Sequence, residues 1–570
     1  MVDSVKDFYP RPQLVRDNIQ ALDGEWEIDG KKVIVPYPPE SKLSGFKGKT
    51  GDVYKYKKIF RVDLPDEGRI LLHFGAVDNK ARFFVNKKEA GCHEGGYLSF
   101  TLDITDFISR QGDNELEVEV FDNTDNTYPY GKQRIKRGGM WYTPVSGIWK
   151  SVWMERVPES YIKDVRITPS LKGITLEVTT NDPKGADMAL GADVTLSDGT
   201  LLHHDFGGGM GIGRSAVIRT FIKIDGAFTD KGELYSPRLW TPEDPYLYSI
   251  KIYYMHDVVE SYFALRTIEI GEVNGVKRVL LNGKPVFMHG VLDQGYFSDG
   301  IFTPKSPFEY EKDILRMKEL GLNMIRKHIK VEPESFYYFC DRHGMMVFQD
   351  MVNNGKYSYF RDTVLPTVGF RKHRLFGKRR TKEEKKVFER HMRDTLKELY
   401  NHPCIVAYTI FNEGWGEFDA DRMYLVAKGE DPTRLYDSAS GWFGGKLNDF
   451  DSVHNYFSGK ADRPKNRPLF ISEFGGVSYP VKGHMFNEDK PYGYGSAGNS
   501  TELTDRIIAR YREIIIPVIK EGACGSVYTQ LSDVEDEING FYTYDREVLK
   551  VDKEKMLALS EEIKGELKRI

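Results

Sequence analysis

Two glutamates follow long apolar runs in the sequence and could work as a chemical pair. One run reads CIVAYTIFNEGWGEFD and carries Asn412 and Glu413, and the other reads PLFISEFGG and carries Glu473. Buried strands are typically continuous apolar runs, so each glutamate is expected where a strand leaves the core. Two nearby carboxylates push their pKa values apart. One of the pair can then protonate a leaving oxygen while the other, ionised, attacks a carbon.

Eight short apolar runs that alternate with helical patterns are expected to position this pair. This alternation predicts a (β/α)8 barrel over residues 269–570, which has the usual length of that fold. An open doubly wound sheet is the alternative, but no Gly-x-Gly-x-x-Gly follows the first run. The predicted strands are residues 285–290, 322–328, 345–351, 405–411, 435–440, 451–456, 469–474 and 525–531.

The mouth of the predicted barrel is where the two glutamates should meet. Reactive groups of such barrels sit at the carboxyl ends of the strands, and strands four and seven face each other across the ring. Glu413 and Glu473 are therefore expected to approach to about 5 Å, the separation found in retaining glycosidases. The alternative is that either glutamate is only an ion-paired residue at a strand end.

Further polar side chains near the strand ends are expected to bind a sugar ring, which needs directed hydrogen bonds and an aromatic floor. Each of them can instead be a core residue with satisfied hydrogen bonds, and Arg326 can equally be an ion-pair partner in the barrel core. In strand order they are His289, Asp293, Arg326, His328, Asp350, Trp442, His454, Tyr456, Tyr528 and Gln530.

The first 268 residues have a different pattern, with many short runs of Val, Ile, Phe and Tyr between turn residues. This spacing predicts two antiparallel β-sandwiches, over residues 1–155 and 156–268, the second of immunoglobulin size. Trp141, Tyr142 and Trp149 form an aromatic cluster in the first of them. We expect this cluster to pack against the barrel, and a carbohydrate-binding platform is the alternative.

Composition and charge exclude several classes of function. The formal net charge is −4, far from the basic footprint of a nucleic-acid-binding protein. No run of about 18 apolar residues and no secretory leader is present, which predicts a cytoplasmic protein without a membrane partner. The four cysteines form no Cys-x-x-Cys pair, and neither cysteine nor histidine clusters at ligand spacing, so no metal and no cofactor are expected.

Two further features leave alternatives open. A basic run over residues 371–386 could bind an anionic glycan or aglycone, although such a run is more often a solvated surface. The aromatic-rich sandwiches would suit a homo-oligomer, but no feature of the sequence requires one.

Several motifs together resemble glycoside hydrolase family 2, which contains β-galactosidases, β-glucuronidases and β-mannosidases. They are FNEGWGEFD, ISEFGG, YPRPQLVRDNIQALDGEWEI, MWYTPVSGIWKSVWME, LNGKPVFMHGV and NHPCIVAYTIFNE. The resemblance covers essentially the whole chain and implies a jelly-roll sugar-binding domain, an immunoglobulin-like domain and a catalytic barrel. It also implies that Glu413 is the acid/base, that Glu473 is the nucleophile, and that Asn412 hydrogen-bonds the sugar 2-hydroxyl. A tyrosine near the nucleophile, here Tyr456, is usual in the family.

Differences from the family's motifs bear on which sugar the protein would accept. Its β-glucuronidases carry an Asn-x-Lys after strand eight, where this chain has Glu537, Ile538 and Asn539, and an acidic residue there would repel a uronate. The magnesium-dependent β-galactosidases of the family carry a Glu-x-His after strand three. This chain reads QDMVNNGKYSYF there and lacks those metal ligands. We therefore expect a retaining exo-β-glycosidase of β-galactosidase type, with β-glucuronidase and β-mannosidase as alternatives. A non-catalytic carbohydrate-binding protein is the alternative of another class.

Overall fold

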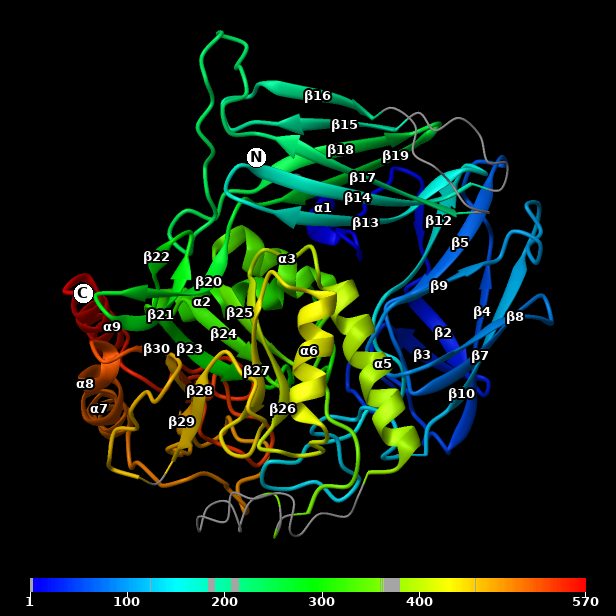
Figure 1. The fold of residues 1–570 in the computed structure, drawn as a ribbon. Helices are drawn as coiled ribbons and strands as arrows, with labels where there is room; N and C mark the ends of the chain where they lie inside the picture. The colour runs from blue at the N-terminus through cyan, green and yellow to red at the C-terminus, as the bar shows by residue number, and fades with distance from the viewer. Residues whose placement is uncertain are drawn as a thin grey trace.

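The protein consists of two β-sandwiches beside an eight-stranded barrel (Figure 1). The structure, a computed structural model, describes residues 4–123, 125–182, 190–206, 215–358, 360, 362, 380–456 and 458–570. In Figure 1 the first sandwich is blue to cyan, the second is cyan to green, and the barrel runs from green to red. The predicted fold class is confirmed.

The first sandwich has two antiparallel sheets, ordered β1-β12-β5-β9 and β3-β2-β4-β10-β7-β8, and a short pair, β11-β6. Buried and half-buried residues alternate along β10, as expected of a strand with one face on a core. The expected boundary after residue 155 falls inside β12. The strands are β1 (Ile19–Ala21), β2 (Gly24–Ile28), β3 (Lys31–Val35), β4 (Val53–Phe60), β5 (Arg69–Phe74), β6 (Val77–Asp78), β7 (Lys80–Val85), β8 (Lys88–Glu94), β9 (Phe100–Asp103), β10 (Asn114–Phe121), β11 (Gly147–Ile148) and β12 (Val152–Val157).

The second sandwich pairs a three-stranded sheet, β13-β14-β17, with a four-stranded sheet, β16-β15-β18-β19. A small sheet, β20-β21-β22, follows and leads into the barrel. The strands are β13 (Tyr161–Pro169), β14 (Gly173–Asn181), β15 (Leu190–Thr195), β16 (Leu201–Phe206), β17 (Ser215–Lys223), β18 (Tyr248–Tyr254), β19 (Asp257–Phe263), β20 (Ile268–Val273), β21 (Val276–Leu281) and β22 (Lys284–Pro285).

The barrel is a parallel sheet of eight strands in the order β27-β26-β25-β24-β23-β30-β29-β28. Each predicted apolar run contributes one strand. All eight residues of β26 are buried, as expected where side chains fill a barrel and helices cover it. The strands are β23 (Met288–Asp293), β24 (Met324–Lys327), β25 (Met346–Asp350), β26 (Ile405–Asn412), β27 (Leu435–Ser440), β28 (Asp451–Asn455), β29 (Leu469–Gly475) and β30 (Ala523–Thr529).

Helices cover the outside of the barrel. The start of α5 is marked by a capping box, in which Thr381 and Glu384 each bond the other's backbone N–H. The helices are α1 (Ser4–Phe8), before the first sandwich, α2 (Phe308–Glu319), α3 (Glu334–His343), α5 (Lys382–Glu398), α6 (Ala420–Glu430), α7 (Ser500–Arg510), α8 (Ile516–Ile519) and α9 (Lys553–Lys568), and a π-helical turn, Tyr511–Ile515, joins α7 to α8. Among the described residues, none of the helices is long and apolar enough to cross a membrane.

The loop between β10 and β11 and the residues that follow β11 carry the first sandwich into contact with the barrel. Trp141 meets Trp415 edge to face at 5.3 Å between ring centroids, and Trp149 meets Phe302 at 5.0 Å. Both tryptophans are buried in the same apolar core as the barrel residues. The expected packing role of this aromatic cluster is confirmed, and the loop lies at the barrel.

A buried ion network joins the N-terminal segment to both sandwiches. Arg16 donates to Glu155 Oε2 at 2.9 Å and to Asp257 Oδ2 at 2.8 Å, and Arg11 donates to the same Glu155 oxygen at 3.2 Å. Burial opposes ionisation of Glu155, but Arg11, His73 and Arg16 lower the pKa of this carboxyl well below its usual range. Arg16, with its two carboxylate partners, therefore holds three parts of the chain together.

Glu155→Gln is expected to lower the free energy of unfolding by about 3–5 kcal/mol, because it removes the buried carboxylate that pairs with Arg11 and that is one of the two pairing with Arg16. Chemical and thermal denaturation would measure the loss. Glu159→Gln removes an exposed partner of Arg69 and should cost about 0–1 kcal/mol. Since the pKa of Glu155 is depressed, its contribution is present above about pH 4.3 and fades as the pH falls further. Equal stability of both variants at pH 7 would contradict this assignment.

Candidate active site

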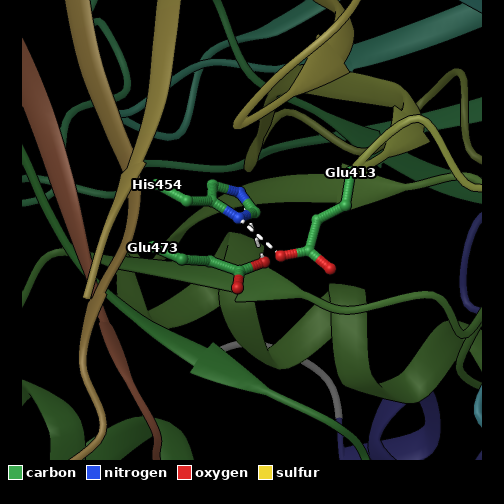
Figure 2. Close-up of side chains that lie close together, drawn as sticks. All are labelled: Glu413, His454 and Glu473. Carbon is green, nitrogen blue, oxygen red and sulfur yellow. Dashed lines mark hydrogen bonds and ion pairs between the residues drawn. The ribbon is translucent and has the colours of Figure 1, made fainter. Parts of the chain in front are cut away.

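Two carboxylates face each other at the mouth of the barrel (Figure 2). Glu413 directly follows β26, has a left-handed backbone with φ of 52°, and donates its N–H to Ser440 O at 3.1 Å. Glu473 lies within β29. One carboxylate oxygen of each lies within 4.8 Å of the other. This separation suits a double displacement, for which the two carboxyl groups lie about 5–5.5 Å apart.

His454, from β28, lies between the two carboxylates (Figure 2). Its Nδ1 is 3.0 Å from Glu413 Oε1, and its Nε2 is 3.5 Å from Glu473 Oε1. The imidazole is fully buried, and the Trp442 ring stands edge-on to it at 5.2 Å between centroids. The histidine therefore forms a hydrogen bond with Glu413 and lies close to Glu473.

The environment of Glu473 favours its ionised form. Burial alone would raise its pKa, but His454 and Arg326 outweigh that effect and lower the pKa to about 2. Arg326 Nη1 donates to Glu473 Oε1 at 3.0 Å, and the Tyr456 hydroxyl donates to Oε2 at 2.7 Å. At neutral pH this carboxylate carries a full negative charge.

Arg326, from β24, bonds side chains of four other barrel strands. Its Nε donates to Asp350 Oδ1 at 3.0 Å, and its Nη2 donates to Asn412 Oδ1 at 2.9 Å and Ser440 Oγ at 3.0 Å. His328 Nδ1 lies 2.7 Å from the other oxygen of Asp350. Arg326 is thus a buried ion-pair partner of two carboxylates in the barrel, Asp350 and Glu473, which is one of the two roles that the sequence left open.

Nine of the predicted site residues therefore belong to one connected network. They are Arg326, His328, Asp350, Asn412, Glu413, Trp442, His454, Tyr456 and Glu473.

The other predicted residues lie in different surroundings. His289 does not close its strand, because β23 begins at Met288 and runs on to Asp293. Its Nε2 lies 3.0 Å from the Tyr511 hydroxyl, in the helix layer. Asp293 forms an ion pair with Lys327, and the Tyr528 ring stacks on Phe541 at 4.7 Å between centroids. None of these three contacts involves Glu413 or Glu473.

Further contacts near the site come from Gln530, which was predicted, and from loop residues that were not predicted. Gln530 Nε2 donates to Asn539 Oδ1 at 2.9 Å, in the loop after β30. The Tyr494 ring stacks on Tyr456 at 4.4 Å between centroids, and Thr529 Oγ1 lies 2.9 Å from the Tyr456 hydroxyl. Tyr494 lies in a loop without a periodic pattern, so no sequence signal identified it.

Two groups of side chains have a spacing that could hold a metal ion. Among the described residues these are Glu413 with His454 and Glu473, and a more exposed group of His484, Asp545 and Glu547. In the first group the Arg326 guanidinium already donates to Glu473, and its positive charge opposes a cation at that carboxylate. Residues 371–379 of the predicted basic run lie outside the described residues.

The fold and the site define a barrel protein with a carboxylate pair at its mouth, preceded by two sandwiches. Three models of glycosyl hydrolases family 2 match the chain: the sugar binding domain over residues 19–158, the model named for the family itself over residues 160–266, and the TIM barrel domain over residues 272–472. The chain belongs to glycosyl hydrolases family 2.

Known relatives resemble the chain at low identity. A β-galactosidase of Thermoanaerobacter pseudethanolicus is 24% identical over 77% of this chain and 58% of its own length. The chain spans about half the length of the curated relatives it matches. Two solved structures share the fold over 98% or more of both chains: a β-D-glucuronidase of Dictyoglomus thermophilum, with 19% identity and a TM-score of 0.72, and a β-galacturonidase of Eisenbergiella tayi bound to galacturonate, with 18% and 0.69.

Proposed function

We propose that the protein is a retaining exo-β-glycosidase that removes terminal β-linked sugars by double displacement. The observation that carries this proposal is the pair Glu413 and Glu473, whose oxygens approach within 4.8 Å while Glu473 is in direct contact with a buried guanidinium. Membership of glycosyl hydrolases family 2 supports it.

In the first step a Glu473 oxygen attacks the anomeric carbon, and the bond from that carbon to the glycosidic oxygen breaks as Glu413 gives its proton to the oxygen. The product is a glycosyl ester of Glu473. In the second step Glu413 takes a proton from water, which attacks the same carbon and releases Glu473. Asn412, whose Oδ1 accepts from Arg326 and Ser440, keeps its amide N–H groups for the sugar 2-hydroxyl.

For the sugar we propose a β-galactoside, with a β-glucuronide or a β-mannoside as alternatives. The β-galactosidase among the relatives supports the first, and the solved β-D-glucuronidase supports the second. Glu537 in place of the Asn-x-Lys favours a neutral sugar. A carbohydrate-binding protein without activity is the candidate of another class, and it would have no need of a proton donor opposite a nucleophile.

Initial rates on a panel of 4-nitrophenyl β-glycosides test this proposal. We expect turnover of the β-D-galactopyranoside, and proton NMR should show the β-anomer of the sugar as the first product. Release of the α-anomer would contradict the double displacement. Sugar binding by calorimetry without turnover of any substrate in the panel would favour the binding protein.

Tyr456→Phe is expected to lower kcat/KM by about 10–100-fold, because a hydrogen bond to a charged group contributes about 1.5–3 kcal/mol. Glu473 must be ionised to attack, so activity falls as the pH drops through its pKa. The lost hydrogen bond raises that pKa, and the acid limb of the pH–rate profile should move to higher pH. Tyr479→Phe, at a half-buried tyrosine outside the network, is the control. An unchanged acid limb would refute the contribution of Tyr456 to the ionisation of Glu473.

A further inference from the structure

The backbone around His454 sets where its imidazole lies (Figure 2). In the parallel register of β28 and β29, His454 is the partner of Glu473, and the register shifts by one residue just before this pair. Such a bulge re-aims a side chain next to an active site. A Cβ at Gly441, directly after β27, would lie 2.6 Å from the imidazole Cγ, so the ring lies against backbone that requires glycine.

The Glu413 carboxylate depends on this imidazole for its position. Among the described residues, its only hydrogen bond is the one between Oε1 and His454 Nδ1, at 3.0 Å. The backbone has a separate anchor, because Ser440 O accepts the N–H groups of Glu413 and Trp442, each at 3.1 Å. Without the histidine, the side chain of Glu413 would keep that backbone anchor and lose its one directed contact.

The Glu473 carboxylate is held by other groups. Arg326 Nη1 donates to its Oε1 at 3.0 Å, and the Tyr456 hydroxyl donates to its Oε2 at 2.7 Å. His454 Nε2 lies 3.5 Å from Glu473 Oε1, and this buried nitrogen has no hydrogen-bond partner in the described part of the chain. The two ring nitrogens are therefore unequal, since Nδ1 bonds one carboxylate and Nε2 only lies near the other.

We propose that His454 is a positioning residue that acts through Glu413. Its Nδ1 holds the acid/base carboxylate at its separation from the nucleophile, while Glu473 keeps its place through Arg326 and Tyr456. This inference rests on the proposed glycosidase function. An imidazole nitrogen donates or accepts a hydrogen bond according to its tautomer, so this contact can form with an ionised Glu413 and with a protonated one.

Two substitutions separate the contributions of the ring nitrogens. An asparagine amide lies where Nδ1 was, and a glutamine amide reaches where Nε2 was, so His454→Asn keeps a partner for Glu413 and His454→Gln removes it. We would compare kcat/KM on the phenyl and the 2,4-dinitrophenyl β-glycoside of the sugar that the wild type prefers. Phenol leaves only with a proton from the acid, whereas dinitrophenolate needs almost no such help.

His454→Gln should lower kcat/KM about 10–100-fold on the phenyl glycoside and less than about threefold on the dinitrophenyl glycoside, as expected for the loss of one hydrogen bond to the acid. His454→Asn should keep both values within about fivefold of wild type, because it restores a partner for Glu413. The matched control, His203→Gln, changes an exposed histidine of β16 and should alter neither value.

A double variant tests whether the effect passes through Glu413. In the Glu413→Gln background the acid is already absent, so His454→Gln should cost less than about a further threefold on either glycoside. Melting curves report whether each variant folds. The ratio between the two substrates does not depend on the amount of folded protein, so it tests the proposal even in a destabilised variant.

Three results would each overturn this role of His454. They are equal losses on the two glycosides, an undiminished loss in the Glu413→Gln background, and a larger loss in His454→Asn than in His454→Gln. The first two would assign the histidine to the substrate or to the fold, and the third to Glu473. Absence of wild-type turnover on every aryl β-glycoside would instead refute the proposed function on which the inference rests.

Discussion

Glu473→Gln is expected to lower kcat on aryl β-glycosides by about 10⁴-fold or more, since a glutamine cannot form the glycosyl ester. Its Oε1 can still accept from Arg326 and its Oε2 position can still meet Tyr456, so the variant should fold. A 2-fluoro sugar with a good leaving group should label the wild-type protein with one sugar, which mass spectrometry would place on the peptide of β29.

The matched control for this change is Glu547→Gln, an exposed glutamate that lies outside the network. It should keep wild-type kcat and accept the fluorinated sugar. Retention of more than about one-tenth of kcat in Glu473→Gln, with a wild-type melting curve, would remove Glu473 from the nucleophile role.

Glu413→Gln is expected to lower kcat by about 10²–10⁴-fold, in a way that depends on the leaving group. A poor leaving group needs the proton of Glu413, so its glycosides should lose most activity in the first step. Aryl glycosides with acidic phenols need little help there, and the glycosyl ester should then accumulate because no base activates water. A burst of phenol release would report this accumulation.

Azide provides a further test of the acid/base role. Glu413→Ala removes the side chain beside His454, and azide, which needs no base, should then restore turnover of the activated aryl glycosides and yield a β-glycosyl azide. Glu473→Gln should show no such rescue. Two results together would argue against Glu413 as the acid/base. Azide would rescue neither variant, and the loss of activity in Glu413→Ala would not depend on the leaving group.

Strand positions in the barrel could be predicted from sequence because the signal is local. A buried parallel strand needs a run of apolar residues, and the polar residue that ends such a run lies near the barrel mouth. Asn412 is the last residue of β26 and Glu413 directly follows it, where this reasoning expects them. His289 shows where prediction from apolar runs fails. The apolar run that contains it begins before the strand does, so the histidine lies near the start of β23 and contacts the helix layer.

The arrangement around the carboxylates could not be predicted in this way. Nothing in the sequence near His454 indicates that its two ring nitrogens approach one glutamate each. The same holds for Tyr142, which lies in the loop between β10 and β11 and donates its hydroxyl to Glu537 in the loop after β30. These contacts join residues that are far apart in the chain, and their geometry depends on the packing of whole domains.

The sequence by itself determined the eight strands of the barrel, the two sandwiches before it and the two glutamates at the strand ends, because hydrophobic periodicity and strand-end chemistry are properties of short segments. Only the tertiary structure decided which polar residues join the site and which serve the core. Closure of the barrel and docking of the first sandwich bring Arg326, His454 and Glu537 to their partners. The charge of a buried group depends on those partners more than on its own residue type.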